Sequence, residues 1–525
     1  MHQKYYGYNY YMESGGCKLY TAVMLPSENG KFPVVIKRSP YVNSTVDFSD
    51  DEYLSNCMAD NEKWLRRGYA VVFQHCRGRG KSNGECEPFI NEREDGLNLQ
   101  NFIRNQKFYN GEIFLWGGSY CCEVHYATAP FAPDIKGAVF RVRDTERYSF
   151  CYRNGFFKTS LFGDWFVSEM YRVRNGITKN YSKKTFDILP LKDFSKTVYG
   201  EAVPVFDEFL KHPDRDDPFW NTHLGGGTER FALRDIKIPV LIETSWYDIF
   251  EGGIFDMWQD MSENAKTQCA FVVSAYDHPD NSDSSPIPFP DASRAQHFGA
   301  EYDVDWCDYV LGKRVAPIEP GKVTYYNLFL NKWTTDDYYT SKESIRFSLG
   351  DKAVTYTYNP FDPPSFPGGL SSNFGGVSFE NPPDIRYDIL HSYTSPFEKS
   401  VLVKGNMTAK LTVSSDCEDT AFYIRISITK DGGDYGLRED IHSISEFYPD
   451  YKPGDIVEIP FTFDEHAFLI KTGERLRVDI ASADDNNYVR HTNLKGHFSE
   501  QTNARVAHNT VYLDKSVLDI PIDEY

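Results

Sequence analysis

The sequence predicts an α/β protein in which a mostly parallel sheet carries a helical insertion and is followed by an all-β domain. In the first 316 residues, apolar runs of strand length alternate with helical patterns, which is typical of a parallel sheet. An aromatic-rich stretch interrupts this alternation, and short alternating strands follow it, as in an antiparallel sandwich of jelly-roll type. We therefore expect a core of residues 1–140 and 228–316, a helical cap of residues 141–227, and a β domain of residues 317–525.

Composition and charge exclude several classes of protein. The chain has 525 residues, too many for one ordinary domain, and 41% of them are hydrophobic, enough for substantial cores. A formal net charge of −20 repels phosphate backbones, so we expect no nucleic-acid partner. No apolar run reaches transmembrane length and no secretory signal opens the chain, so we expect no membrane partner. The ten cysteines form no C-x-x-C pair, which favours reduced thiols and a cytoplasmic location.

Four elements precede the most informative stretch of the chain. Lys18–Pro26 and Phe32–Lys37 are apolar runs of strand length, and Tyr69–Gln74 has the texture of a buried strand. Glu94–Gln106 has apolar residues at helical spacing, so it predicts a helix that packs on a sheet. Strands and helices in this order are the beginning of a parallel α/β sheet.

The stretch Asn110–Ala129 has the pattern of a strand, a tight turn and a helix. Ile113–Trp116 is a short apolar run, Gly117 and Gly118 follow it, and Ser119 stands before a helical segment. A serine at the apex of such a turn projects its hydroxyl out of the sheet. The free N–H groups and positive dipole end of the following helix stabilise developing negative charge. We therefore predict that Ser119 is a nucleophile.

Two later strands each end near a residue suited to activating a serine. Asp248 follows the strand Ile238–Thr244, and His278 follows the strand Ala270–Ser274. Chemistry collects at the carboxyl edge of an open α/β sheet, so both residues are expected near Ser119. Histidine can take the serine proton, and aspartate can hold the imidazole in the required tautomer. The order serine, aspartate, histidine along the chain is that of α/β hydrolases.

Alternatives to these roles stay open. A helix N-cap or loop acid is an equally good reading of Asp248 taken alone, and a surface loop histidine before a proline is the favoured reading of His278 taken alone. Their joint placement after successive strands supports both catalytic roles, and His297 is the main rival for the base. His75 and His125 have no companion at metal-ligand spacing, so we predict no metal and no cofactor.

Two pairs of aromatic residues are candidates for binding the substrate. An oxyanion would need two donors, and we expect the backbone N–H of Tyr120 and the phenol of Tyr41, in the loop after an early strand. Trp165 and Phe166 belong to the aromatic-rich cap and are expected to line an acyl pocket. The alternative for these two is that they form the core of the cap.

The β texture of the last 200 residues is regular. Apolar residues at 476, 478 and 480 alternate with charged ones, as on a strand with one buried face. Further strands are expected at Val354–Tyr358, Met407–Val413, Phe422–Ile428 and Ile456–Phe463.

Five motifs together make the chain similar to the CocE/NonD family of serine hydrolases. Residues 38–41 resemble the family's R-x-P-Y, and residues 77–82 its R-G-x-G-x-S turn. Residues 117–120 resemble G-x-S-Y, residues 246–248 resemble W-Y-D, and residues 306–311 are similar to W-x-D-x-x-L. The resemblance covers nearly the whole chain. The family includes cocaine-esterase-like enzymes, α-amino-acid ester hydrolases and glutaryl acylases, and it is related to X-Pro dipeptidyl peptidases.

The resemblance implies an α/β-hydrolase core, a helical cap and a C-terminal jelly roll. It also implies that the hydroxyl of Tyr41 is the second oxyanion donor and that Asp248 and His278 complete the triad. Two positions depart from the family's pattern. Cys122 stands where a glycine usually follows the serine by three residues, and His75 stands where an aspartate usually precedes the R-G-x-G turn. Neither departure removes a catalytic group.

The leading hypothesis is hydrolysis of a small carboxylic ester, an amide or a short peptide through an acyl-serine intermediate. An X-Pro dipeptidyl peptidase is the second hypothesis. Glu251, three residues after the predicted acid, is a candidate for binding a substrate ammonium group, although a solvated loop acid is the favoured reading. A third hypothesis is a catalytically inactive binding protein that uses the jelly roll. The oligomeric state stays open, with a homo-oligomer among the candidates.

Overall fold

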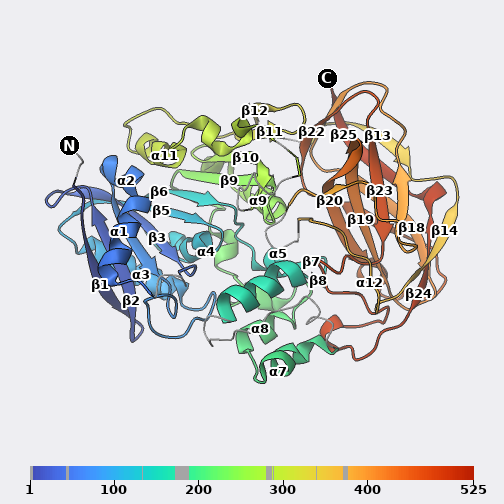
Figure 1. Ribbon diagram of the computed structural model, residues 1–525, viewed down its shortest axis with the longest axis horizontal. Helices are drawn as coiled ribbons and strands as arrows, with labels where there is room; N and C mark the ends of the chain where they lie inside the picture. The colour runs from blue at the N-terminus through green and yellow to red at the C-terminus, as the bar shows by residue number, and fades with distance from the viewer. Residues whose placement is uncertain are drawn as a thin grey trace.

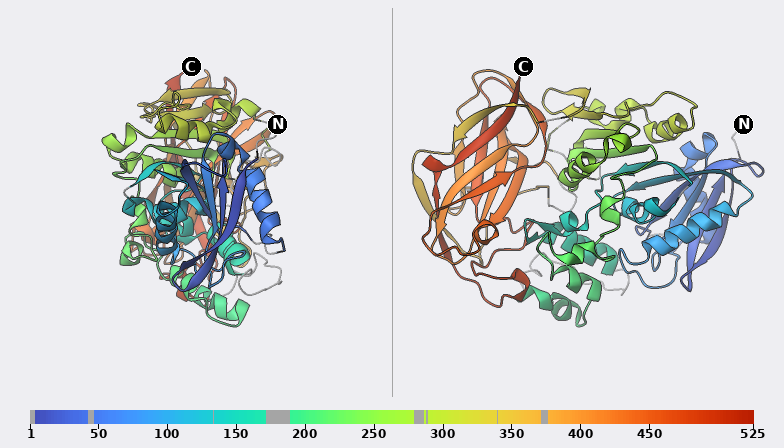
Figure 2. Two further views of the ribbon diagram at one scale, coloured as in Figure 1. Left: turned by 90° about the vertical axis from the view of Figure 1, so that its left-hand side faces the viewer. Right: turned by 180° about the vertical axis from the view of Figure 1, so that it is seen from behind.

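The computed structural model describes residues 4–42, 47–132, 134–171, 189–278, 286–287, 289–338, 340–370 and 376–525. Figure 1 shows an α/β region built on a central sheet, a β sandwich beside it, and a mostly helical segment that lies below the two. The two views in Figure 2 show the same arrangement from the side and from behind. This is the predicted fold class, an α/β-hydrolase core with a cap and an all-β C-terminal domain.

The central sheet has ten strands in the order β1-β2-β4-β3-β5-β6-β9-β10-β11-β12. The six pairings from β4 through β3, β5, β6, β9 and β10 to β11 are parallel, and antiparallel strands extend the sheet at both ends. The carboxyl ends of the parallel strands therefore meet at one edge. The strands are β1 (Tyr6–Ser14), β2 (Cys17–Leu25), β3 (Phe32–Ser39), β4 (Ala70–His75), β5 (Tyr109–Gly118), β6 (Ile135–Arg141), β9 (Val240–Tyr247), β10 (Ala270–Asp277), β11 (Val323–Asn327) and β12 (Lys332–Asp336).

Helices cover both faces of this sheet. Alternate residues of β5 point to opposite faces, so Phe114 belongs to one apolar cluster and its neighbours Ile113 and Leu115 to another. The first cluster also contains Trp64 and Trp306, which lie on helices of that face. One face carries α1 (Asp50–Asp60), α2 (Glu62–Arg66) and α11 (Tyr302–Val310), and the other carries α3 (Glu92–Arg104), α4 (Tyr120–Tyr126), α9 (Glu251–Asp260) and α10 (Glu263–Lys266).

The cap is not purely helical. After α5 (Arg147–Cys151) the chain forms a short antiparallel hairpin from β7 (Tyr152–Arg153) and β8 (Phe156–Phe157). Two π-helical turns, α7 (Phe194–Tyr199) and α8 (Pro204–Phe209) complete the described part of the cap. Its aromatic side chains pack on one another, for example Phe162 on Phe209 with ring centroids 5.1 Å apart. Burial of these rings therefore holds the short elements together.

The C-terminal domain is an antiparallel sandwich of two sheets. The larger sheet has the order β14-β24-β18-β25-β17-β22, with β13 and β21 paired to its members, and the smaller has the order β15-β20-β19-β23-β16. Every described pairing within these two sheets is antiparallel. The elements are β13 (Glu343–Ser348), β14 (Ala353–Tyr358), β15 (Phe379–Glu380), β16 (Leu390–Tyr393), β17 (Val401–Lys404), β18 (Thr408–Ser415), β19 (Ala421–Lys430), β20 (Gly433–Ser443), α12 (Ile444–Phe447), β21 (Val457–Thr462), β22 (Ala467–Ile470), β23 (Arg475–Ala481), β24 (Ala507–Tyr512) and β25 (Val517–Glu524).

The boundary expected at residue 317 does not coincide with the end of the central sheet. Strand β11 pairs in parallel with β10, Phe271 opposite Val323, and β12 pairs with β11. An alternating β pattern shows that a segment is a strand but not which sheet it joins, so the sequence alone places residues 323–336 in the β domain. Within the described ranges, no helix is long and apolar enough to cross a membrane.

Candidate active site

Ser119 occupies a tight turn between β5 and α4. Its backbone has φ +55° and ψ −133°, a conformation that side chains rarely adopt, and its N–H donates to the carbonyl oxygen of Arg141 at 2.9 Å. A Cβ on Gly117 would lie 2.1 Å from the carbonyl oxygen of Cys121, so the turn closes only with glycine there. The backbone therefore forms the strained serine turn that the sequence predicts.

His278 and Asp248 lie beside Ser119 because their strands are neighbours. In the parallel pair β9–β10, Tyr247 is opposite Asp277, so the residues that follow these two leave the sheet together. The Nε2 atom of His278 is 3.0 Å from the Oγ of Ser119. Its Nδ1 atom is 3.4 Å and 3.5 Å from the two carboxylate oxygens of Asp248. The contact between His278 and Asp248 is long, as hydrogen bonds within an active site often are before substrate binds.

The backbone of the following turn fixes the carboxylate of Asp248. Its side chain is fully buried, and one of its oxygens accepts a 2.7 Å hydrogen bond from the backbone N–H of Phe250. The Phe250 ring in turn packs edge-on against the imidazole of His278, with centroids 5.6 Å apart. These contacts orient the acid and the imidazole toward each other.

Tyr41 follows β3, at the same sheet edge, and its hydroxyl is hydrogen-bonded to the side chain of Ser119. The indole N–H of Trp165 donates to the same hydroxyl at 3.0 Å. Tyr41 as a residue is 38% exposed. Its hydroxyl lies among other side chains, and the loss of solvation there raises the pKa of Tyr41, so the hydroxyl keeps its proton. The side chain of Tyr120 points elsewhere, because its hydroxyl accepts from the N–H of Phe89 and contacts Glu92. Of Tyr120, then, only the backbone N–H is a candidate donor.

Trp165 and Phe166 occupy different surroundings. The ring of Trp165 packs at a tilt against that of Tyr120, with centroids 5.4 Å apart, and its indole N–H joins the cap to Tyr41. Phe166 packs against Phe206, with centroids 5.1 Å apart, inside the cap. The placement of Phe166 favours the alternative interpretation, a core residue of the cap.

Glu251 stands at the beginning of α9 and is among the residues that line the cavity next to Asp248. Its buried carboxylate lies 3.4 Å from the guanidinium of Arg438, which belongs to the β domain. Burial raises the pKa of Glu251 well above its usual value, although Arg438 opposes this shift. The carboxylate of Glu251, a candidate for binding a substrate ammonium group, therefore already has the guanidinium of Arg438 as its cationic neighbour.

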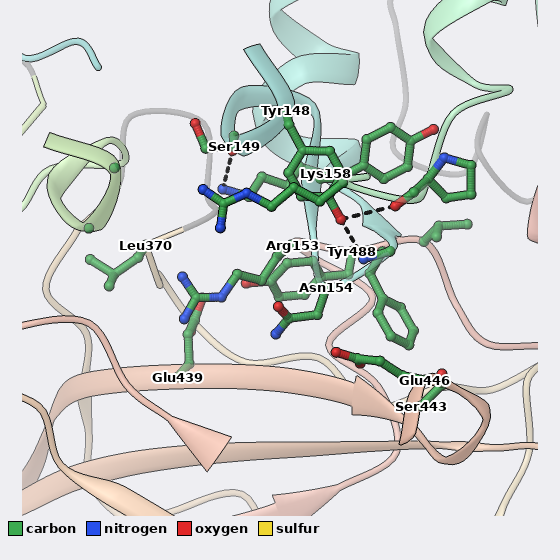
Figure 3. A pocket seen from close by; sticks show the side chains of 18 of the residues that line it. Tyr148, Ser149, Arg153, Asn154, Lys158, Leu370, Glu439, Ser443, Glu446 and Tyr488 are labelled. Carbon is green, nitrogen blue, oxygen red and sulfur yellow. Dashed lines mark hydrogen bonds between the residues drawn. The ribbon is translucent and has the colours of Figure 1, made fainter. Parts of the chain in front are cut away.

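A cavity of about 850 Å³ lies where the cap, the beginning of α9 and the β domain meet, as Figure 3 shows in part. Charged side chains of both signs line it, among them Arg153, Lys158, Glu439 and Glu446. Burial lowers the pKa of Lys158 to about 8, and its ammonium donates to the backbone carbonyl of Ser149 at 2.7 Å. The cavity is a polar space that Asp248, the predicted acid, helps to line, whereas Phe166 does not line it.

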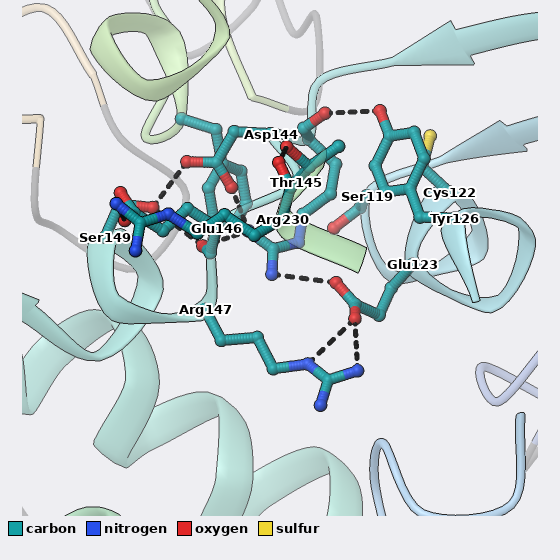
Figure 4. Close-up of polar contacts among 12 residues, drawn as sticks. Ser119, Cys122, Glu123, Tyr126, Asp144, Thr145, Glu146, Arg147, Ser149 and Arg230 are labelled. Atoms are coloured by element: carbon teal, nitrogen blue, oxygen red, sulfur yellow. Dashed lines mark hydrogen bonds and ion pairs between the residues drawn. The ribbon is translucent and has the colours of Figure 1, made fainter. Parts of the chain in front are cut away.

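A buried ionic network lies behind the serine turn, and the sequence analysis missed it. Glu123 of α4 is fully buried and accepts from Arg143 at 2.9 Å and from Arg147 at 2.8 and 2.9 Å (Figure 4). Arg143 also contacts Asp144, whose pKa burial raises to about 6. Glu123 lies one helical turn after Ser119, which is a usable signal, but its partners are 20 and 24 residues away.

The remaining sequence candidates have structural partners. The Nδ1 atom of His75 accepts from the backbone N–H of Lys81 at 3.1 Å, and burial lowers the pKa of His75 to about 3. The thiol of Cys122 contacts the backbone of Arg141 at 3.3 Å. The ring of His297 stacks on Trp333. In the part of the chain that the structure describes, no three His, Cys, Asp or Glu residues are grouped to hold a metal ion.

Comparison with known proteins gives consistent matches. The family model of the X-Pro dipeptidyl-peptidase (S15 family) matches residues 15–279, and that of the X-Pro dipeptidyl-peptidase C-terminal non-catalytic domain matches residues 319–517. Cocaine esterase of Rhodococcus sp. (strain MB1 Bresler) is 23% identical over 547 residues, which cover 92% of this chain and 91% of that protein.

Solved structures of similar fold cover almost the whole chain. An aminopeptidase from a marine sediment archaeon (Thaumarchaeota archaeon) has a TM-score of 0.82 at 17% identity, covering 99% of this chain and 96% of its own. An α-amino acid ester hydrolase has a TM-score of 0.81 at 18% identity, covering 99% and 97%. A CocE/NonD family hydrolase from Staphylococcus aureus has a TM-score of 0.67 at 17% identity, covering 98% and 92%.

Proposed function

Because the chain belongs to the X-Pro dipeptidyl-peptidase (S15) family, we propose that Ser119, His278 and Asp248 carry out its hydrolytic reaction. The enzyme is a serine hydrolase that cleaves a carboxylic ester or amide. One observation carries the assignment of residues: the imidazole of His278 lies 3.0 Å from the hydroxyl oxygen of a serine in a strained turn. That is the contact a general base needs in order to activate a serine.

Acylation begins when the Oγ atom of Ser119 attacks the substrate carbonyl carbon and its proton passes to Nε2 of His278. The carboxylate of Asp248 stabilises the imidazolium that forms. The imidazolium then donates its proton to the leaving oxygen or nitrogen, the tetrahedral intermediate collapses, and an acyl-serine ester remains.

Deacylation repeats these steps with water as the nucleophile. Water attacks the acyl carbon while its proton passes to His278, and the returning proton releases Ser119 as a neutral hydroxyl. In both halves the negative charge on the carbonyl oxygen needs preorganised donors. We assign these to the backbone N–H of Tyr120 and the hydroxyl of Tyr41, which the hydrogen bond between Tyr41 and Ser119 supports.

A small ester, an amide or a short peptide is the proposed substrate. A relative is a cocaine esterase, and similar folds belong to an α-amino acid ester hydrolase and an aminopeptidase. X-Pro dipeptidyl peptidase activity is the second candidate, because the matching family carries that name. Rates on a phenyl acetate, an alanyl ester and an Ala-Pro reporter separate the two, since an X-Pro peptidase cleaves only the last efficiently.

The test of the nucleophile is intact-mass analysis after incubation with a fluorophosphonate. We expect a single adduct on the wild-type enzyme and none on Ser119→Ala. Ester turnover by Ser119→Ala should be lower than that of the wild type by about 10³-fold or more. No adduct on the folded wild-type protein would contradict the assignment and favour the inactive binding protein. We further propose a cytoplasmic location, which the ten free cysteines support.

A further inference from the structure

One arginine of the β domain reaches into the loop that carries the proposed catalytic acid. Arg438 lies on β20, and none of its side chain is exposed. Its Nη1 atom donates to the backbone carbonyl of Trp246, the penultimate residue of β9, at 3.0 Å. Its Nη2 atom lies 3.4 Å from the carboxylate of Glu251. A single guanidinium thus contacts the chain two residues before Asp248 and three residues after it.

The same guanidinium is anchored firmly on its own side. Its Nε atom donates to the backbone carbonyls of Asp464 and Glu465 at 3.2 Å and 3.0 Å, and Nη1 also donates to that of Leu437 at 2.8 Å. A planar guanidinium with several fixed donors keeps one orientation. Because its anchors lie in the loop between β21 and β22, the β domain sets the position of the end of β9.

The segment from Trp246 to Glu251 is a tight turn that transmits this position to the acid. The N–H of Asp248 donates to the carbonyl of Ser245 at 3.0 Å, and the N–H of Glu251 donates to the carbonyl of Asp248 at 3.1 Å. A shift at Trp246 or Glu251 therefore moves the carboxylate of Asp248. The contact from Asp248 to His278 is already 3.4 Å or longer, so little displacement is needed to lose it.

We propose that Arg438 is a positioning residue for Asp248, through which the C-terminal β domain contributes to the assembly of the triad. This inference rests on the function proposed above. Arg438 does not touch the substrate or the reacting atoms. It holds both ends of the turn that presents the catalytic acid, so its loss should impair the support of the imidazolium rather than substrate binding.

The test is Arg438→Met, with Arg477→Met as the matched control. Arg477 lies in the same sheet on β23, is equally buried, and its ion-pair partners Glu380, Asp434 and Asp479 all belong to the β domain. We expect Arg438→Met to lower kcat by roughly 10- to 100-fold with KM changed less than about twofold. Arg477→Met is expected to keep kcat at temperatures where it is folded.

The pH profile separates positioning from simple loss of stability. If Asp248 is displaced, it supports the imidazolium of His278 less, so the acid limb of kcat/KM should move to lower pH in Arg438→Met. Arg438→Lys, which can restore only part of the donor set, should give an intermediate shift. Equal kcat and equal pH profiles in Arg438→Met and the wild type would overturn the proposal, and so would equal losses of kcat in the Arg438 and Arg477 variants.

A second variant covers the case in which Arg438→Met does not fold. Arg438→Met combined with Glu251→Met removes both buried charges, an exchange that folded proteins often tolerate. The donor to Trp246 is still missing in this double variant, so a reduced kcat with a shifted acid limb is expected, and wild-type values would overturn the proposal.

Fluorophosphonate labelling separates failure of the proposed nucleophile from failure of the positioning role of Arg438. A wild-type enzyme that does not react contradicts the proposed nucleophile, whereas equal labelling rates of wild type and folded Arg438 variants contradict the positioning role alone.

Discussion

At the scale of single residues, the indole of Trp165 decides how the hydroxyl of Tyr41 is used. The indole N–H occupies one acceptor position of that hydroxyl, which leaves the phenolic hydrogen available for the oxyanion that we propose forms at Ser119. We expect Trp165→Phe, which keeps an aromatic ring beside Tyr120, to lower kcat about tenfold. Steady-state kinetics on an accepted ester measures this loss.

A double-mutant cycle with Tyr41→Phe tests that explanation. Tyr41→Phe removes the proposed donor and should cost roughly 10²-fold or more in kcat. Once the hydroxyl is gone the indole has nothing to orient, so Trp165→Phe should then have little further effect. If the two losses multiplied, Trp165 would act by packing or substrate contact, and the orienting role would be wrong.

The residues of the candidate site were not equally predictable. Ser119, Asp248 and His278 stand directly after strand patterns, so their meeting at one sheet edge follows from the parallel order of the strands. The partner of Tyr41 could not be found this way, because Trp165 is 124 residues away and belongs to another part of the fold. Glu251 was a candidate for binding the substrate, and only the folded chain reveals that an arginine of another domain faces it.

At the scale of the element, the turn between β5 and α4 depends on a close approach of two backbones. A methyl group at position 117 would lie 2.1 Å from a backbone carbonyl oxygen, whereas one at position 118 would have its nearest neighbour at 3.9 Å. We expect Gly117→Ala to destabilise the fold by about 3 kcal/mol or more, since neither backbone segment can yield. Chemical denaturation followed by circular dichroism measures the change.

Gly118→Ala is the control for that substitution. It adds the same methyl group to the same turn and does so in ordinary contact distance, so a change within about 1 kcal/mol is expected. Similar free energies of unfolding for both variants would contradict the steric explanation of the turn.

The sequence predicts the helices and longer strands better than it predicts which strands pair with each other. The helix expected at Glu94–Gln106 is α3, displaced by two residues, and the strand expected at Tyr69–Gln74 is β4, displaced by one. The hairpin of β7 and β8 was missed because two-residue strands carry no periodicity. Strands β11 and β12 were recognised only as β texture, since pairing with β10 is a tertiary property.

At the scale of the whole molecule, charged contacts join the cap to the β domain. Arg153 of the cap hairpin donates to Asp440 at 2.9 Å and to Asp464 at 2.8 Å, and Asn154 donates to Asp440 at 2.8 Å. His442 extends this contact, with one nitrogen 3.2 Å from Asp440 and the other 2.8 Å from Glu446. Arg153 is 287 residues from Asp440 and 311 from Asp464, so the sequence carries no local sign of the contact between the cap and the β domain.

The charge of His442 makes this contact depend on pH. Burial alone would lower its pKa, but the hydrogen bonds and charges of Asp440 and Glu446 outweigh burial and raise the pKa to about 9. Burial likewise opposes ionisation of Asp440, yet Arg153 and His442 hold its pKa at about 2. The folded chain therefore keeps a proton on His442 that the unfolded chain, with an ordinary pKa near 6.5, releases first.

The expected result is a loss of stability between pH 6.5 and 9. A histidine whose pKa is raised on folding stabilises the folded state fully below its unfolded pKa and loses that contribution as the pH rises through its folded pKa. We expect the free energy of unfolding to fall by on the order of 3 kcal/mol over this window because of His442 alone. In His442→Gln, which keeps hydrogen-bonding groups but cannot titrate, the difference from wild type should shrink over the same range. Denaturant titrations of both proteins at pH 6 and pH 9 measure the two slopes. Parallel pH dependence would mean that folding does not raise the pKa of His442, which would contradict the pH-dependent role of this contact.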